Sequence, residues 1–140
     1  MNRLSFSLRT TPDAVFLCIG GNDGLRGIPV DETKTAIRAI IDGIKQQNIP
    51  VIIAGITLPA NYTTYYIDAF NAIMPDLAKE YDIPIMPFLL KGVAGNPDLN
   101  LRDHIHPNQA GHKKIAQSIH EFLVEIGWLT DQNEWRIPPH

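Results

Sequence analysis

The chain has 140 residues, of which 44% are hydrophobic and 19% charged, and its net charge is −3. This composition is typical of one globular domain with a single core, and it excludes a largely disordered chain. No basic stretch predicts binding to nucleic acid or to an anionic membrane, and no apolar run reaches the roughly 18 residues of a membrane span. The only cysteine, Cys18, excludes an internal disulfide, and its place in an apolar run predicts a buried thiol.

Three apolar runs predict the strands of a sheet. The runs 14–19 and 49–56 are almost continuously apolar, as strands buried on both faces are. The third run, 83–90, contains Pro84 and Pro87. Because proline cannot donate a hydrogen bond to a neighbouring strand, we expect this third strand near an edge of the sheet.

Apolar stripes with helical spacing lie between and after these runs. The stripe over 37–44 predicts a helix with Asp31 as its N-cap. The stripe over 67–77 predicts a second helix that is kinked or broken at Pro75. The stripe over 115–126 predicts a third helix.

The third helix has its own start and stop signals. Asn108 is a suitable N-cap and Gly127 a suitable terminator, whereas residues 128–140 show no period and end in two prolines before the last histidine. We therefore expect a domain over residues 1–127 and a loosely packed extension over 128–140. The alternation of strands and helices predicts an α/β fold with a parallel sheet, whose ligands bind at the carboxyl ends of the strands.

The turn Gly20-Gly21-Asn22-Asp23-Gly24 follows the first predicted strand. The amide of Asn22 can donate hydrogen bonds, and a donor fixed at a strand end can stabilise an oxyanion. The alternative is a plain turn, because asparagine, aspartate and glycine are common turn residues. No phosphate-binding glycine motif is present.

Asp103 and His106 are three residues apart, just before the third predicted helix. A carboxylate at this spacing can bind Nδ1 of the imidazole and leave Nε2 as a general base. One alternative is a solvated loop that caps the helix. A second is a metal cluster that also uses His104 and His112, although no other group of ligands supports it.

The sequence contains three serines, Ser5, Ser7 and Ser118. A nucleophilic serine usually occupies a sharp turn after a strand, often beside glycine. Ser118 lies within a helical stripe, and Ser5 and Ser7 precede the first strand. None has the expected setting, so we predict that the nucleophile is absent from this chain.

Four motifs in order resemble the SGNH (GDSL) hydrolases, in particular the branch of bacterial arylesterase, thioesterase I and lysophospholipase. They are Gly-Gly-Asn-Asp-Gly-Leu-Arg-Gly (20–27), Leu-Pro-Ala-Asn-Tyr (58–62), Gly-Val-Ala-Gly-Asn-Pro (92–97) and Asp-His-Ile-His-Pro-Asn (103–108). The similarity runs from about Pro12 to about Leu123.

The resemblance implies a three-layer α/β/α flavodoxin-like sandwich that hydrolyses small acyl esters, thioesters or lysophospholipids through a Ser-His-Asp triad. It implies no cofactor, metal or nucleic-acid partner. It assigns Asp103 and His106 as triad acid and base, and Asn22 as an oxyanion donor. More weakly, it assigns four residues to the borders of a substrate groove: Leu58, Pro59, Tyr62 and Val93.

The sequence differs from the family pattern near its N-terminus. The family begins with a strand ending in Gly-Asp-Ser, followed by a second block, and neither is found in the residues before Asn22. We therefore expect an N-terminally truncated hydrolase that is nearly inactive alone. A non-catalytic descendant that binds a lipid or a partner is the alternative.

The expected truncation has structural consequences. In a flavodoxin-like sheet the missing first strand would pair with the strand 14–19. Its absence predicts an exposed apolar edge and self-association. The N-terminus lacks the pattern of a secretory signal, so the chain alone assigns no compartment. Members of the resembled branch often carry an export signal, which would place the protein in the periplasm or outside the cell only if it lies in the missing segment.

Overall fold

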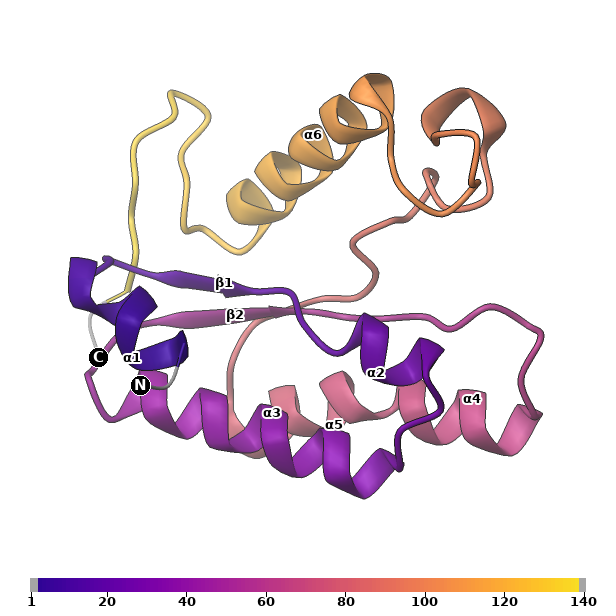
Figure 1. Cartoon of the computed structure of the whole chain (residues 1–140). Helices are drawn as coiled ribbons and strands as arrows, with labels where there is room; N and C mark the ends of the chain where they lie inside the picture. The colour runs from indigo at the N-terminus through magenta and orange to yellow at the C-terminus, as the bar shows by residue number, and fades with distance from the viewer. Residues whose placement is uncertain (1–2, 139–140) are drawn as a thin grey trace. The chain divides into compact units, whose positions relative to one another are not determined.

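Three short strands form a parallel sheet in the order β1-β2-β3 (Figure 1): β1 (Val15–Leu17), β2 (Val51–Ala54) and β3 (Ile85–Met86). The structure is a computed structural model that describes residues 3–138. The central strand β2 is buried at all four positions, and β3 lies at an edge, as its prolines predict. The expected α/β class and parallel sheet are confirmed.

The described residues divide into two compact units, 3–87 with 137–138, and 88–136. The sheet and most of the core belong to the first unit. The second layer of helices that a three-layer sandwich requires stays a prediction, as does a domain boundary after residue 127.

Helices α3 (Val30–Lys45), α4 (Thr64–Asn71) and α5 (Ile73–Tyr81) lie on one side of the sheet (Figure 1). The spacing of the α3 isoleucines places Ile37, Ile41 and Ile44 in the core. From α5 and the strands, the core includes Leu77, Ile53 and their neighbours. The hydrophobic effect over this one face therefore holds the first unit together.

The predicted interruption at Pro75 is confirmed. Helix α4 ends at Asn71 and α5 begins at Ile73, so that Pro75 occupies the first turn of α5. A proline is tolerated there because the first amides of a helix have no intrahelical acceptor. By contrast, the prediction of Asp31 as N-cap is wrong: α3 begins at Val30, and Asp31 lies in its first turn, where the helix dipole favours a carboxylate.

The prediction of a buried Cys18 is also wrong, because the thiol is exposed. Side chains alternate across a strand, and Leu17 packs in the core. Its neighbour Cys18 therefore faces away from that core, just past the end of a strand only three residues long. Continuous apolar sequence alone did not distinguish this edge strand from a central one.

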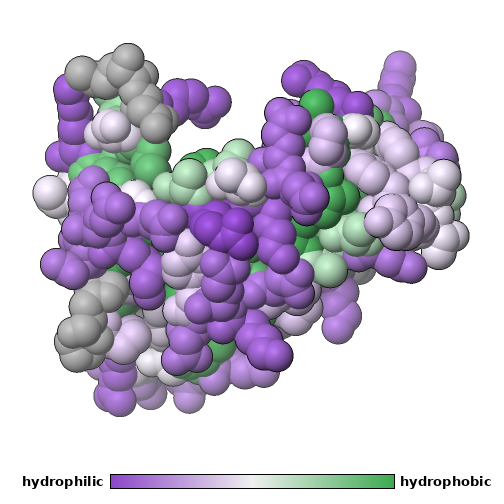
Figure 2. All heavy atoms as spheres, turned by 90° about the horizontal axis from the view of Figure 1, so that it is seen from below, coloured by the Kyte–Doolittle hydropathy of each residue, from purple (hydrophilic) through white to green (hydrophobic). Residues whose placement is uncertain are grey.

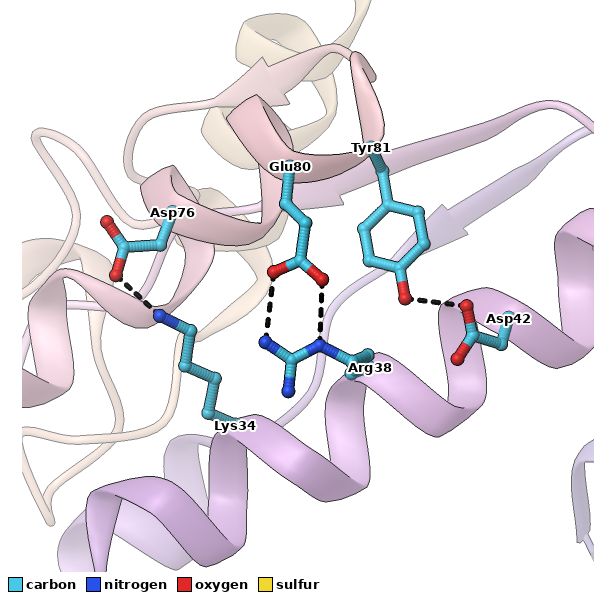
Figure 3. A network of polar contacts seen from close by, with 6 residues as sticks. All are labelled: Lys34, Arg38, Asp42, Asp76, Glu80 and Tyr81. Carbon is cyan, nitrogen blue, oxygen red and sulfur yellow. Dashed lines mark hydrogen bonds and ion pairs between the residues drawn. The ribbon is translucent and has the colours of Figure 1, made fainter.

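Polar pairs join α3 to α5 on their outer side (Figure 3). The ion pairs are Lys34–Asp76 at 2.6 Å and a bidentate Arg38–Glu80 contact at 2.8 and 2.9 Å, and Tyr81 donates to Asp42 at 2.6 Å. On α3 these residues recur about once per turn, and on α5 Asp76 lies about one turn before Glu80 and Tyr81, so they form a ladder between the two helices. Seen from below, the surface is mainly hydrophilic (Figure 2).

The described part of the chain begins with two short helices, α1 (Arg3–Ser7) and η1 (Leu8–Thr10). The short helix α2 (Gly21–Leu25) follows β1. The second unit contains η2 (Pro97–Leu99) and α6 (Gln109–Glu125). No helix within residues 3–138 is long and apolar enough to cross a membrane.

Both predicted ends of α6 are confirmed. The side chain of Asn108 accepts hydrogen bonds from the amides of Ala110 and Gly111, and Gly127, at φ +75°, follows the helix. The expected loose packing of the extension is wrong at its start, because Trp128 and Leu129 are buried. The backbone amides of both residues donate to the carbonyl of Leu123.

Candidate active site

Asp103 and His106 contact each other in the loop before α6. Nδ1 of His106 lies 2.8 Å from Oδ2 of Asp103. The other carboxylate oxygen, Oδ1, accepts the backbone amides of Ile105 and His106, each at 2.9 Å. The predicted pairing of the two side chains is therefore present in the second unit, and the spacing of three residues is what allows it.

The hydrogen bonds to the carboxylate favour its ionised form. The backbone amides of His106 and Ile105, followed by the His106 ring, hold the pKa of the Asp103 carboxyl well below its usual range. An ionised carboxylate can only accept hydrogen bonds, so Nδ1 carries the proton that lies between the two side chains. In the neutral ring Nε2 is then unprotonated and can accept a proton.

The imidazole is accessible from solvent. The His106 side chain is 71% exposed, and that of Asp103 is 44% exposed. Leu101 and Ile105, in the same loop, are exposed apolar side chains. A base that points to solvent beside apolar groups can meet an external substrate without rearrangement of the loop.

A closed turn holds this dyad. The His104 amide donates to the Leu101 carbonyl at 2.9 Å, and the Leu101 amide donates to the His106 carbonyl at 2.7 Å. His104 adopts φ +58°, a conformation unusual for a residue other than glycine. The loop closes through an antiparallel bridge between Asn100 and Pro107. Its hydrogen bonds thus fix the backbone on both sides of Asp103.

Two supporting residues were not predicted from the sequence. Asn100 is buried and donates to the carbonyls of Val93 and Asn96, both at 2.7 Å. An isolated asparagine in a loop carries no signal for this role. Gly111 packs so closely that a Cβ there would lie 2.1 Å from the Leu99 carbonyl oxygen. A glycine within a helical pattern was a usable signal of such a close approach.

Asn22 lies on α2, directly after the strand that ends at Leu17 and a short connection. Its side chain is exposed and makes no hydrogen bond to another residue in the described part of the chain. Gly20 enters the helix at φ +94°, which favours glycine, and its carbonyl accepts the amides of Asp23 and Gly24. The amide of Asn22 is therefore available to an external acceptor.

The residues predicted at the groove have two different settings. Leu58 and Val93 are buried, at 5% and 0% exposure, and Leu58 packs in the core of the first unit. Pro59 is exposed, and Tyr62 is partly exposed and donates to the Leu25 carbonyl. Only Pro59 and Tyr62 present side chains to solvent, and the groove itself stays a prediction.

The metal alternative finds no support in residues 3–138, where no three His, Cys, Asp or Glu side chains come close enough to hold an ion. Asp103 and His106 contact each other, but His104 and His112 do not join them as a cluster.

The serines lie on helices. Ser5 and Ser7 are exposed on α1, and Ser118 is on α6, about 13 Å along the helix axis from its first residue. None occupies a turn that follows a strand. Asn22 belongs to the first unit and the dyad to the second. The alternation of strands and helices predicts that both lie at the carboxyl edge of the sheet, and their meeting there stays a prediction.

Comparison with known proteins gives a consistent result. A family model described as "GDSL-like Lipase/Acylhydrolase family" matches residues 2–114. The chain is 42% identical over 105 residues to thioesterase 1/protease 1/lysophospholipase L1 of Escherichia coli (strain K12), which covers 75% of the chain and 50% of that protein. It is 35% identical over 115 residues to the arylesterase of Vibrio mimicus, which covers 82% of the chain and 58% of the relative. The chain thus spans about half the length of these curated relatives.

Solved structures show the same similarity. The crystal structure of TesA matches with a TM-score of 0.81 and 30% identity, over 89% of this chain and 69% of the other. The psychrotrophic esterase EstA from Pseudoalteromonas sp., inhibited by monoethylphosphonate, matches with a TM-score of 0.84 and 27% identity, over 89% and 68%. The motifs, the parallel sheet and these matches agree, and the chain belongs to the GDSL-like lipase/acylhydrolase family.

Proposed function

We propose that this protein hydrolyses acyl esters, with His106 as general base, Asp103 as the residue that orients it, and Asn22 as an oxyanion donor. The observation that carries the proposal is the contact of His106 Nδ1 with Asp103, which leaves Nε2 exposed. This arrangement is the acid–base half of a hydrolytic triad.

In the proposed reaction, Nε2 of His106 takes the proton of a serine hydroxyl as the serine oxygen attacks the acyl carbonyl. The Asn22 amide donates to the oxyanion of the tetrahedral intermediate. His106 then returns the proton to the leaving oxygen or sulfur, and water releases the acyl group by the same sequence of steps. These steps call for no metal or cofactor.

The serine is, in this proposal, supplied by a longer form of the protein. Two observations support this: none of the three serines lies in a turn directly after a described strand, and the chain spans about half of its curated relatives. The first relative is named a thioesterase and lysophospholipase, and another an arylesterase. Small acyl esters, thioesters and lysophospholipids are therefore the substrates that we propose.

The test is steady-state hydrolysis of a short-chain p-nitrophenyl ester by a form extended by the codons that precede Met1. We expect His106→Ala to lower kcat about a thousandfold or more, because the proton acceptor is lost. His104→Asn is the matched control, since asparagine tolerates the positive φ of an exposed residue in the same loop. It should retain activity.

Equal activity of the His106→Ala and wild-type proteins would contradict the proposal. An extended form that binds lysophospholipid but hydrolyses no ester or thioester would instead support the alternative of a non-catalytic binding protein, which the lack of a suitably placed serine favours.

A further inference from the structure

Two backbone carbonyls shortly after Asn22, those of Leu25 and Ile28, accept hydrogen bonds from tyrosine hydroxyls. Helix α2 has only five residues, so its last carbonyls find few partners within the helix. The Tyr62 hydroxyl donates to the Leu25 carbonyl at 2.8 Å, and the Tyr66 hydroxyl donates to the Ile28 carbonyl at 2.8 Å. Both bonds reach across more than thirty positions of sequence.

The two tyrosines are fixed by their own surroundings. The Thr63 side chain caps α4 by accepting the Tyr66 amide. The ring of Tyr66 packs between those of Tyr62 and Phe70, with centroids 5.9 and 5.8 Å apart. Burial, together with Tyr62 and Asp23, raises the pKa of Tyr66, which keeps its hydroxyl protonated as a donor. The rings therefore present both hydroxyls from a rigid support.

Gly24 of α2 packs closely against Leu58 and against Phe70 of α4. A Cβ at Gly24 would lie 2.5 Å from Cδ2 of Leu58 and 2.8 Å from Cζ of Phe70. Leu58 is tied to α4, because its amide donates to the Asn71 side chain at 3.2 Å. Close packing at Gly24 and the hydroxyl contact at Leu25 thus fix the C-terminal end of α2, and the contact at Ile28 fixes the segment that follows it.

We propose that Tyr62 and Tyr66 are positioning residues that hold α2, and with it the amide of Asn22, at the carboxyl end of β1. The role of Asn22 in this statement rests on the proposed function. The hold on α2 rests only on contacts within the first unit. Asn22 makes no side-chain hydrogen bond within residues 3–138, so within these residues its position depends on the backbone that carries it.

Amide hydrogen exchange of the 140-residue chain, measured by NMR, tests directly whether Tyr62 and Tyr66 stabilise α2. The reporters are the Arg26 amide, which donates to the Asn22 carbonyl, and the Ile28 amide, which donates to the Asp23 carbonyl. Tyr66→Phe should speed exchange at both about fivefold, the effect of one lost hydrogen bond. Tyr62→Phe should have a smaller effect, because its contact is more exposed.

Tyr65→Phe is the matched control. Tyr65 is the neighbour on the same helix, it is 86% exposed, and its hydroxyl has no hydrogen bond to the described residues. It should leave exchange unchanged. The amides of α5 report global stability: exchange that is unchanged in Tyr62→Phe and Tyr66→Phe, or that rises equally in α5, would overturn the proposal.

Kinetics separate this inference from the proposed function. In the extended form, Tyr66→Phe should lower kcat about fivefold with little change in KM, and should have no further effect in an Asn22→Ala background. Equal effects in both backgrounds would overturn a role through Asn22. If no form hydrolyses an ester, the proposed function fails while the exchange data still decide whether the tyrosines hold α2.

Discussion

The two oxygens of the Asp103 carboxylate have different roles in the structure. Oδ1 accepts two backbone amides and so fixes the turn, whereas Oδ2 contacts Nδ1 of His106. One side chain therefore shapes the loop and contacts the His106 ring. This dual role predicts that its two functions can be separated by substitution.

Asp103→Asn provides that separation. The amide oxygen can still accept the two backbone amides, but the amide nitrogen can only donate toward Nδ1. We expect neutral His106 to change from the Nδ1–H to the Nε2–H tautomer, with the loop still folded, and kcat of the extended form to fall by several orders of magnitude. Long-range ¹H–¹⁵N NMR of the imidazole measures the tautomer, and an unchanged tautomer would contradict the proposed role of Asp103.

At the scale of elements, α3 to α6 were predictable and α2 was not. Periodic apolar residues marked α3 and α6, because burial of one face is a property of the sequence itself. Helix α2 has a turn-like sequence, and its helical form depends on the close seat of Gly24 against Leu58 and Phe70, which are distant in the chain. The exposure of Cys18 was missed because the apolar run does not show which of its side chains face the core.

The dyad was predictable from spacing, but its support was not. Asp103 and His106 lie within four residues, so local geometry brings them together. Asn100 acts through the carbonyls of Val93 and Asn96, which local sequence does not identify.

Gly111 provides a test of the contact between α6 and η2, which precedes the loop that carries Asp103 and His106. A Cβ there meets the Leu99 carbonyl at 2.1 Å, and the obstacle is backbone. We expect Gly111→Ala to destabilise the protein by about 1–3 kcal/mol, as overpacking does. Gly21→Ala is the control, because no atom lies within 4 Å of its Cβ position and its φ is not positive. Urea unfolding measures both, and equal midpoints would show that the contact does not constrain the fold.

The ladder between α3 and α5 predicts a dependence on alkaline pH. Burial, followed by the hydrogen bond to Asp42, raises the pKa of Tyr81 to about 12 (Figure 3). Because the pKa of Tyr81 is raised in the folded state, its contribution to the free energy of unfolding is fully present below the unfolded tyrosine pKa of about 10. We expect the free energy of unfolding to fall as pH rises from about 10 to about 12.

Tyr81→Phe removes this titration and its hydrogen bond. The variant should lose about 1 kcal/mol at neutral pH and show a smaller decline over the same alkaline range. Tyr65→Phe, which removes an exposed hydroxyl, is the control. Chemical denaturation at a series of pH values gives the comparison, and parallel curves for wild type and Tyr81→Phe would refute the assignment.

At the scale of the whole molecule, the described sheet has two edge strands, β1 and β3, each with one neighbour. Within the described residues β1 pairs only with β2, through the register Val15↔Val51 to Leu17↔Ile53. An edge strand with apolar side chains is a template for pairing with another chain. We therefore expect the 140-residue chain to self-associate.

A charge on this strand should weaken the association. Phe16→Lys places an ammonium on the edge strand and should raise the concentration at which dimers form, whereas Cys18→Ser, just past the strand, should not. Sedimentation velocity under reducing conditions measures both. A wild-type chain that stays monomeric at high concentration would show that the β1 edge is not a site of association.

The most direct test of the central claim is fluorophosphonate labelling read by mass spectrometry. The probe reacts with an activated serine, and it would be applied to the 140-residue chain and to the form extended by upstream codons. We predict no label on the 140-residue chain, and on the extended form a label on a preceding serine that is lost in His106→Ala. A label on Ser5, Ser7 or Ser118, or an upstream label that persists in His106→Ala, would contradict the assignment of His106 as the base for a serine outside this sequence.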